Sequence, residues 1–182
     1  HAGFGWPQFS IHRGDLHAVL LDACKSRIGA DRIYAGWKGV RIEQDRDGAT
    51  AYFRNAVSQE DLPPQRGAVA IGCVGINSAI RKQLYPDEGP PIYSGVNMWR
   101  GVTRWQPFLS GACLTRAGWL DSGKMVIYPI RNHIDADGRQ LVNWVAELTT
   151  PKYQRRDWNR PGNLDDFIGN FADWHFDWLD VP

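Results

Sequence analysis

The sequence predicts an α+β fold in which an α/β portion precedes an antiparallel sheet. Apolar side chains recur between residues 16 and 24 at the three- and four-residue spacing of a helix with one buried face. The stretch Ala68–Pro86 starts with small apolar residues, bends at two glycines and continues in a helical pattern that ends near Leu84. Four strand-like stretches with short links then follow between residues 92 and 149, which is typical of an antiparallel sheet.

Composition narrows the functional class. The 182 residues, 43% hydrophobic and 23% charged, are enough for one domain or somewhat more with an ordinary core. The 21 Lys and Arg are interspersed with 20 Asp and Glu, so nothing indicates a nucleic-acid or membrane partner. Without an apolar run near about 18 residues or a signal-peptide pattern, we expect a cytoplasmic protein. Three widely spaced cysteines favour reduced thiols, and no motif has metal-ligand spacing, so no metal site is expected.

The first half of the chain contains a predicted helix and a β-ribbon. A helix begins near Arg13, which the sequence alone predicts to be an exposed arginine at the start of the helix. Alternating patterns at 32–36, 39–45 and 49–54 predict strands, with Asp47-Gly48 as the hairpin signal between the last two. The polar, proline-interrupted residues 59–66 predict a loop.

The bend at Gly72 and Gly75 follows a predicted strand at 68–71 and precedes a predicted helix opened by Asn77 and Ser78. A turn without side chains lets a ligand approach the backbone closely. The same pattern also suits a purely structural turn.

The predicted antiparallel sheet comprises residues 92–104, 112–118, 124–130 and 139–149. In the first strand, alternation puts Met98 and Arg100 on one face together with Val102 and Arg104, and Trp99 on the other. An arginine beside Met and Tyr side chains suits an aromatic acid, whose anion needs a charged partner and whose ring needs apolar walls. The alternative is an arginine that forms a cross-strand ion pair.

The last part of the chain predicts a polar loop at 154–162 and a helix at 163–180, with Leu164, Phe167, Ile168 and Phe171 on one side. Asp173, His175 and Asp177 fall on different faces of such a helix, which argues against a metal site. Most of the nine Trp residues are expected to be packed in the interior.

Several phrases resemble those of the flavin-dependent aromatic hydroxylases, the salicylate hydroxylase and phenazine-modifying kind. Residues 71–81 (IGCVGINSAIR) lie over the family phrase V-G-A-D-G-I-H-S-x-V-R, with Val74 where the family has Asp. Residues 11–16 (IHRGDL) match I-H-R-x-x-L, and residues 99–101 and 128–130 match W-R-G and Y-P-I. The resemblance covers nearly the whole chain.

The resemblance implies a partial FAD/NAD(P)-binding monooxygenase fold. Residues 1–86 would be the middle part of the FAD-binding domain, 87–153 the substrate-binding sheet, and 154–182 a loop and helix leading back toward the FAD domain. The family's dinucleotide phrase G-x-G-x-x-G and its G-D-A-A-H-P phrase are missing from this sequence, so we expect a fragment of a longer enzyme.

The resemblance also implies site residues. The residues expected to contact FAD are Arg13, Val40, Gly72 and Gly75. The residues expected to bind the aromatic substrate are Met98, Arg100, Tyr128 and Trp144. Of these, Arg100 and Tyr128 are the catalytic candidates. NAD(P)H would be the co-substrate, and a homodimer is left open. Val74 in place of the acid removes a polar contact of about 1 to 3 kcal/mol if that contact is buried. We therefore expect this chain alone neither to hold FAD tightly nor to turn over.

Two other classes stay open. A non-catalytic module could use the same aromatic sheet to bind flat aromatic ligands, and an association domain could use the Trp residues as core and interface. Flavin binding discriminates between these readings and the hydroxylase.

Overall fold

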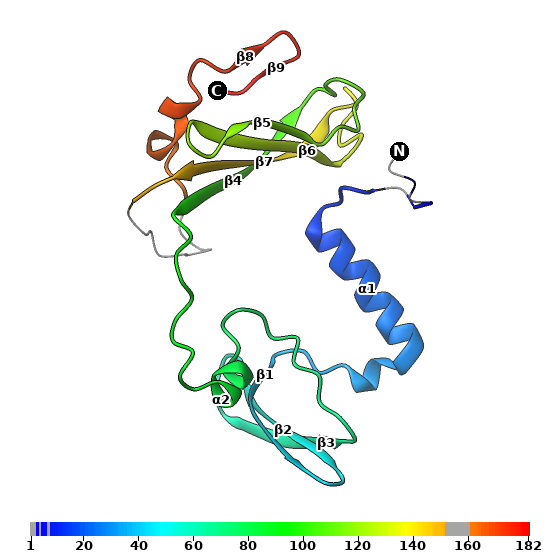
Figure 1. The fold of residues 1–182 in the computed structure, drawn as a ribbon. Coiled ribbons are helices and arrows are strands. Elements are labelled where there is room, and N and C mark those ends of the chain that lie inside the picture. Colours follow the sequence, from blue (N-terminus) through cyan, green and yellow to red (C-terminus); the bar gives the residue numbers. More distant parts are fainter. Residues whose placement is uncertain (1–2, 4, 7, 152–160) are drawn as a thin grey trace. The chain divides into compact units, whose positions relative to one another are not determined.

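The fold is described from a computed structural model, which describes residues 3, 5, 6, 8–151 and 161–182 (Figure 1). It is mixed α+β, dominated by antiparallel sheets, as the sequence predicts. The chain divides into two compact units, His1–Leu20 with Tyr93–Pro182 (unit 1) and Leu21–Ile92 (unit 2). Most of the loop predicted at 154–162 lies outside the described residues. The predicted division into 1–86, 87–153 and 154–182 stays a prediction.

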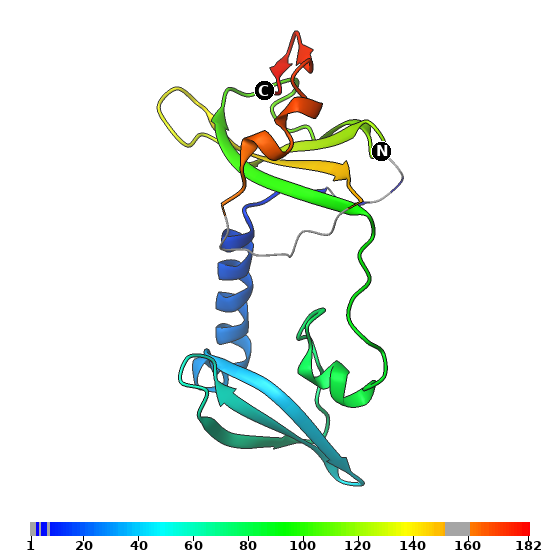
Figure 2. The same ribbon diagram turned by 90° about the vertical axis from the view of Figure 1, so that its left-hand side faces the viewer.

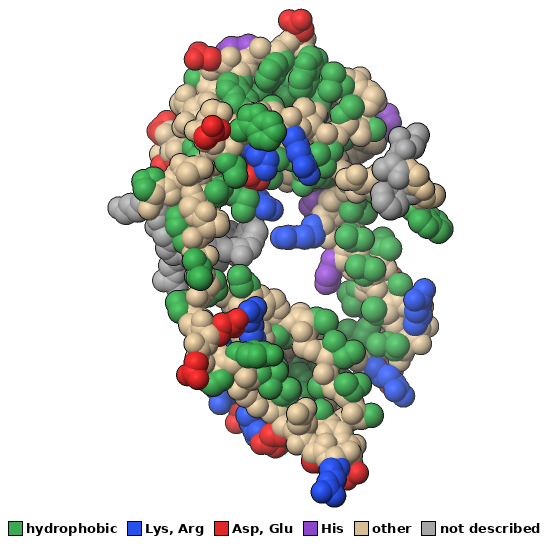
Figure 3. All heavy atoms as spheres, in the orientation of Figure 1, with side chains coloured by type: hydrophobic (Ala, Val, Ile, Leu, Met, Phe, Trp, Pro, Cys, Tyr) green, Lys and Arg blue, Asp and Glu red, His purple; other side chains and the backbone are tan. Residues whose placement is uncertain are grey.

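The predicted first helix is α1, Arg13–Ile28. Its apolar stripe was expected to be buried, and this expectation is wrong, because no residue of α1 is buried. Leu16, Val19 and Leu20 are all exposed, and Figure 3 shows hydrophobic side chains gathered over the visible face of α1. The described residues supply nothing that packs over this stripe.

Unit 2 is built on the sheet β1-β2-β3, formed by Trp37–Asp45, Gly48–Asn55 and Asp61–Gly67. The predicted hairpin is confirmed, since β1 and β2 pair antiparallel up to Asp45 and Gly48. The strand predicted at 32–36 is absent; the short 3-10 helix η1, Ala30–Arg32, and a turn occupy this stretch. Its few residues have no neighbouring strand in the described sheet with which to pair.

The loop predicted at 59–66 is also wrong, because most of it forms the edge strand β3. Pro63 and Pro64 lack the N–H that a central strand needs, but an edge strand tolerates them. The pairing register shifts opposite these prolines, between Ala51 and Phe53.

The bend region of unit 2 keeps its predicted helix but not its predicted strand. The helix is α2, Ala79–Leu84, and the Ser78 hydroxyl caps it by accepting from the Arg81 N–H at 3.0 Å. Gln83 holds α2 to β1 through two bonds to the Ile42 backbone, at 2.9 and 2.6 Å. Residues 68–71 are exposed and unpaired, because no strand lies beside them to complete a ladder.

Unit 1 is built on a four-stranded antiparallel sheet, as predicted, and the order of its strands is β4-β7-β6-β5. The strands are β4 Val96–Trp105, β5 Thr115–Trp119, β6 Gly123–Arg131 and β7 Gln140–Thr149. In Figures 1 and 2, the segment 161–182 lies over one face of this sheet. We call that covered side the core face and the other side the open face.

The helix predicted at 163–180 is wrong. The segment instead forms two 3-10 turns and a small hairpin: η2 Leu164–Asp166, η3 Ile168–Asn170, β8 His175–Phe176 and β9 Leu179–Asp180. Phe167 and Phe171 are both buried against the core face. Burial of these rings from a segment that also contains Gly169 outweighs the helical spacing of its apolar residues.

The hydrophobic cluster found among the described residues lies in unit 1, where the segment 161–182 covers the core face. Trp99 stacks on Phe167 with ring centroids 5.4 Å apart, and Phe171 meets Trp174 edge-on at 4.9 Å. Trp144 packs over Gly101, where a Cβ would lie 2.0 Å from the indole ring. Four Trp side chains lie in or against this cluster: Trp99, Trp144, Trp174 and Trp178. Trp6, Trp105 and Trp119 are exposed, so the expectation that most of the nine Trp residues are packed in the interior holds for only these four of the described ones.

Candidate substrate- and cofactor-binding site

The register of the four-stranded sheet defines the open face. Paired residues of neighbouring antiparallel strands point to the same side, so each ladder row can be followed across the sheet. One row comprises Arg100, Val145, Val126 and Arg116, and the next comprises Val102, Asn143 and Tyr128. Flanking rows add Met98, Glu147 and Lys124 on one side and Arg104 and Leu141 on the other.

The structure brings three of the four predicted substrate residues together on this open face. Met98 and Arg100 come from β4, and Tyr128 from β6, with β7 between them. The Arg100 Nη2 lies 3.9 Å from the Met98 sulfur. Arg100 is exposed, lies opposite Val145, and forms no ion pair within the described part of the chain. The cross-strand ion pair that the sequence left open is therefore not formed among the described residues.

Trp144, the fourth predicted substrate residue, lies on the opposite, core face. Its indole Nε1 donates to the Thr103 hydroxyl at 3.1 Å, and its ring lies 5.8 Å from that of Phe167. A cavity of about 480 Å³ on this face is lined by Trp144, Trp105, Phe167, Met125 and Leu179 among others. The structure therefore does not bring Trp144 together with Arg100 and Tyr128.

The sequence reasoning missed two residues of the open face. Asn143 lies between Val102 and Tyr128 on the middle strand, and its Nδ2 is buried without a described hydrogen-bond partner. Arg116 lies at the far end of the row that begins with Arg100. Strand alternation predicts the face of each residue, but pairing order β4-β7-β6-β5 is needed to place Asn143 and Arg116 beside the predicted ones.

Among the described residues of the open face, positive charge is in excess. Lys124 is neutralised by Glu147, with 2.8 Å between Nζ and Oε2. Arg100, Arg104 and Arg116 form no ion pair with any described residue. Val145 is buried yet is not part of the core cluster, so it forms an apolar floor between the charged ends of its row. Such a face can hold a flat apolar ring that carries an anion.

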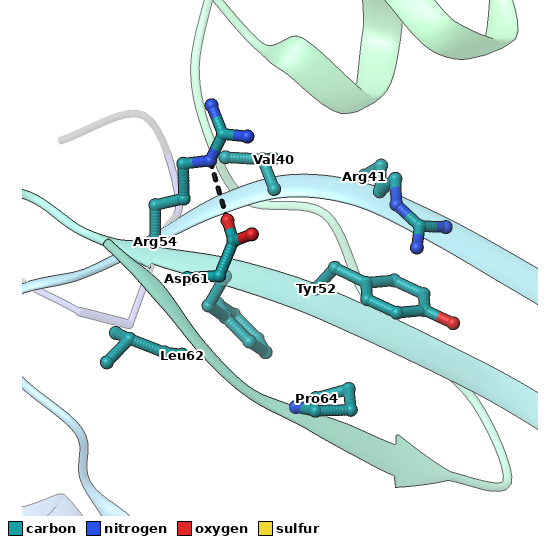
Figure 4. A pocket seen from close by; sticks show the side chains of 8 residues that line it. Val40, Arg41, Tyr52, Arg54, Asp61, Leu62 and Pro64 are labelled. Atoms are coloured by element: carbon teal, nitrogen blue, oxygen red, sulfur yellow. Dashed lines mark hydrogen bonds and ion pairs between the residues drawn. The ribbon is translucent and has the colours of Figure 1, made fainter. Parts of the chain in front are cut away.

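Val40, predicted to pass the flavin, lines a cavity of about 580 Å³ in unit 2 (Figure 4). The Arg41 guanidinium lies 3.3 Å above the centre of the Tyr52 ring. The Tyr52 hydroxyl and the Arg41 guanidinium both bond the Glu43 carboxylate and hold its pKa below the usual value. Arg54 pairs with Asp61 across the same cavity at 2.8 Å.

No described atom packs against the two glycines of the bend, Gly72 and Gly75. Gly75 has a φ of +72°, which favours glycine, and a Cβ built at either position meets no atom within 4 Å. Val74, between them, is exposed. This backbone admits a close neighbour, as a contact to a long cofactor requires, but Val74 offers no polar group to one.

Arg13 is the first residue of α1, and the start of this helix is fixed to β6. The His12 N–H donates to the Ile130 carbonyl at 3.0 Å. The Arg131 Nη2 bonds both carboxylate oxygens of Asp15 at 2.7 Å, which lowers the pKa of Asp15. The chain thus holds Arg13 in unit 1 at a defined place beside the end of β6.

No cluster of three or more His, Cys, Asp or Glu side chains that could hold a metal ion occurs among the described residues. No helix within the described ranges is long and apolar enough to cross a membrane.

Comparison with known proteins supports the resemblance seen in the motifs. No protein-family model matches the chain. The chain is 33% identical, over its full length, to the phenazine 1,6-dicarboxylic acid hydroxylase of Lysobacter antibioticus, of which it covers 45%. It is 30% identical to a 3-amino-4-hydroxybenzoate 2-monooxygenase of Streptomyces platensis, with 96% of this chain and 40% of the relative covered. With the 6-hydroxynicotinate 3-monooxygenase of Pseudomonas fluorescens the identity is 25%, over 94% of this chain and 41% of the relative.

These relatives are ring-directed hydroxylases and monooxygenases, and the match extends through both units of the fold. The homologues of this chain are therefore FAD-dependent aromatic monooxygenases, the family that its motifs resemble. It spans less than half the length of each of these three relatives.

Proposed function

We propose that this chain is the substrate-holding part of a monooxygenase that hydroxylates an aromatic acid with FAD, NAD(P)H and O₂. The observation that carries the proposal is the open face, where Arg100 and Tyr128 flank an apolar strip on a sheet whose sequence matches aromatic-ring hydroxylases. The relatives act on carboxylated or hydroxylated rings by their names, which agrees with an arginine-lined apolar face.

In this proposal Arg100 binds the carboxylate of the substrate, because a guanidinium offers two parallel donors to a carboxylate. Tyr128 orients the ring through its hydroxyl, which donates to or accepts from a ring substituent. Met98 supplies a polarizable apolar wall beside Arg100. Trp144 lies on the core face and does not contact the substrate in this proposal. Its indole N–H donates to the Thr103 hydroxyl and so stabilises the sheet that carries the open face.

Arg13, Val40, Gly72 and Gly75 are the proposed flavin contacts. The bare backbone at Gly72 and Gly75 fits a close approach, and the Arg13 guanidinium fits phosphate or ribose oxygens. When bound, FAD supplies the electrons taken from NAD(P)H and the activation of O₂. The protein's own part is to orient the ring and exclude water from it.

The experiment measures flavin and aromatic binding separately on the 182-residue chain. Because Val74 replaces an acid and the two flavin phrases are missing, we expect weak FAD binding and no aromatic-dependent NAD(P)H oxidation. We expect 2-naphthoate to bind, and Arg100→Gln to weaken it about tenfold, while Arg54→Gln in unit 2 leaves it unchanged. Stoichiometric FAD with turnover would contradict the first expectation, and equal affinities in the two variants would contradict the second.

A non-catalytic module for flat aromatic ligands is the second candidate, and the aromatic-lined cavity on the core face is the observation that favours it. Trp144 and Phe167 line that cavity, so ligand entry there would quench Trp fluorescence. Quenching by an uncharged ring such as naphthalene, unaffected by Arg100→Gln and by FAD, would support the module. A cytoplasmic location and a homodimeric assembly stay predictions.

A further inference from the structure

Among the described residues, three of the four strands at the edges of the two larger sheets carry features that discourage a further strand from pairing. β3 contains Pro63 and Pro64, and β5 is only five residues long, with Gly118 at a φ of +72°. On β1, the Gln83 side chain already bonds the N–H and the C=O of Ile42. The fourth edge strand, β4, pairs with β7 over its whole length without a register shift. β4 is therefore the edge to which a further strand can pair most readily.

The pairing of β4 with β7 determines which backbone groups of β4 are left over. Just outside the strand, the Thr150 N–H donates to the Gly95 carbonyl at 2.8 Å, and these two residues continue the register of the ladder. Hydrogen-bonded and non-hydrogen-bonded pairs alternate along an antiparallel ladder. The odd-numbered residues of β4 therefore bond β7, whereas the N–H and C=O groups of the even-numbered residues point away from the sheet. The even-numbered residues are Val96, Met98, Arg100, Val102 and Arg104.

The outward backbone groups form a regular set of donors and acceptors. In the part of the chain that the structure describes, β7 is the strand that pairs with β4, and no turn or loop backbone bonds the even-numbered residues. A partner strand can satisfy all of these groups in one ladder, as peptides do when they add to the edge of a sheet.

The side chains of the even-numbered residues lie on the open face and define the chemistry of such a partner. Arg104 is exposed and forms no ion pair with any described residue, and Val102 is 51% exposed. An acidic residue opposite Arg104 and a β-branched residue opposite Val102 are the cross-strand neighbours that stabilise a ladder at these positions. Arg100 binds the aromatic acid in the proposed function, so the residue opposite Arg100 is best neutral.

A second copy of this chain is a poor partner for the same edge. β4 contains two arginines and no acidic residue. Two copies paired through β4 would bring the arginines of both strands into one strip of the sheet, without a carboxylate from either strand. Because like charges on neighbouring strands are destabilising, the charge of β4 favours an acidic strand over a second β4.

We propose that the outer edge of β4 binds an extended, acidic segment of a partner protein as a fifth, antiparallel strand. The partner's backbone bonds the outward groups of the even-numbered residues, its acidic residue contacts Arg104, and its β-branched residue packs on Val102. The inference goes beyond the proposed function, because it uses the edge of the sheet and Arg104 rather than the ring-binding residues Arg100 and Tyr128.

The test titrates the 182-residue chain with the acetylated and amidated peptide TETVTTTVT. In the antiparallel register this peptide places Glu opposite Arg104, Val opposite Val102 and Thr opposite Arg100. Amide hydrogen exchange, measured by NMR, should be slow at the odd-numbered residues of β4 and fast at the even-numbered ones in the free chain. The peptide should slow exchange at the even-numbered residues from Met98 to Arg104. Unchanged exchange at the solubility limit of the peptide would overturn the proposal.

Two changes remove one backbone bond of the added strand. Val102→Pro deletes an outward N–H that β7 does not use, so the sheet should stay folded while the peptide binds about tenfold more weakly. Methylation of the peptide nitrogen at the Val opposite Val102 blocks the reciprocal bond without changing the protein, and it decides the question if the proline variant does not fold. A methylated peptide that binds as well as the unmodified one would exclude strand pairing.

Arg104→Gln and Arg100→Gln are a matched pair of variants, since each removes one charge from the same face of β4. Arg104→Gln should weaken the peptide about threefold, the usual effect of one cross-strand ion pair, and leave binding of 2-naphthoate unchanged. Arg100→Gln should weaken 2-naphthoate and affect the peptide much less. Equal loss of peptide affinity in the two variants would mean that a diffuse positive field attracts the peptide, and would overturn the proposal.

The outcomes also separate this inference from the proposed function and from self-association. If 2-naphthoate binds through Arg100 and the peptide does not bind, the proposed function stands and the inference fails; the reverse result leaves the inference and removes the function. Analytical ultracentrifugation of the chain alone should show a monomer. A dimer whose formation protects the even-numbered amides of β4 would identify a second copy as the occupant and overturn the acidic partner.

Discussion

Asn143 is a single residue at which stability and binding are expected to oppose each other. Its Nδ2 is buried on the open face, between Val102 and Tyr128, without a described partner. A buried donor without a partner costs roughly 1 to 3 kcal/mol of stability. Sites that tolerate such a cost are frequently those where a ligand completes the bond.

Asn143→Leu removes this donor while keeping a side chain of similar size. We expect the free energy of unfolding, from urea titration, to rise by about 1 kcal/mol, because no amide is then desolvated. We also expect the unmodified chain to bind 6-hydroxy-2-naphthoate more tightly than 2-naphthoate, because the Asn143 Nδ2 can donate to the ring hydroxyl, and we expect the variant to lose this preference. An unchanged preference would show that Asn143 does not bind the ring hydroxyl, and a drop in stability would show that its amide already has a partner.

Asp15 and Arg131 provide a second test at the scale of single residues. The Arg131 guanidinium lowers the pKa of the Asp15 carboxyl through two hydrogen bonds. A carboxyl whose pKa is lower folded than unfolded stabilises the fold above its unfolded pKa, near 3.8, and loses this contribution as the pH falls through the folded value. At neutral pH the ion pair therefore stabilises the contact between the start of α1 and the end of β6, and this contribution is lost in acid.

Arg131→Gln should raise the pKa of Asp15, followed by NMR titration of its carboxyl carbon. It should also flatten the pH dependence of stability in the acid range. Arg54→Gln removes a comparable exposed pair in unit 2 and should leave the Asp15 titration where it is. A titration of Asp15 that is the same in all three proteins would exclude the pairing.

At the scale of elements, local patterns predict the antiparallel sheet of unit 1 and the β1-β2 hairpin well. Alternating apolar and polar residues and turn residues such as Asp47-Gly48 determine local structure in the segments that contain them, so these elements can be read from the sequence. The failures share a non-local cause. β3 is a strand because β2 offers it an edge, and residues 68–71 are not a strand because no described neighbour pairs with them.

The segment 161–182 is the clearest case in which packing overrides local pattern. Phe171 is fully buried, contacts Phe167 and Trp174 edge-on, and fixes η3 against the sheet. Phe171→Ala should lower the free energy of unfolding by about 3 to 5 kcal/mol, because it removes a buried ring and leaves a cavity. Leu164→Ala, in the same segment but exposed, should change it by less than about 1 kcal/mol. Urea titration followed by Trp fluorescence measures both, and similar losses would mean that Phe171 is not the anchor.

At the scale of the whole molecule, the sequence names candidate site residues but does not predict how they are arranged. Family phrases single out Arg100, Tyr128 and Trp144, but only strand pairing separates Trp144 from the other two by the thickness of the sheet. Asn143 and Arg116 become visible only once β7 is known to lie between β4 and β6. A motif shows which residue types are present. Which of those residues lie together on one face of the sheet depends on how strands distant in sequence pair.

The two units differ in how much apolar surface each buries on its own. All ten buried residues of the core cluster lie in unit 1, whereas Ala49 is the buried hydrophobic residue found among the described residues of unit 2. Hydrophobic burial is the main favourable contribution to folding, so local opening should cost much less in unit 2. Hydrogen–deuterium exchange at neutral pH should therefore show strong amide protection along the central strands β6 and β7, and faster exchange along β1 and β2, although these two strands also pair antiparallel. If the β1-β2 amides were as protected as those of β6-β7, unit 2 would have to gain its stability from contacts beyond its own described core.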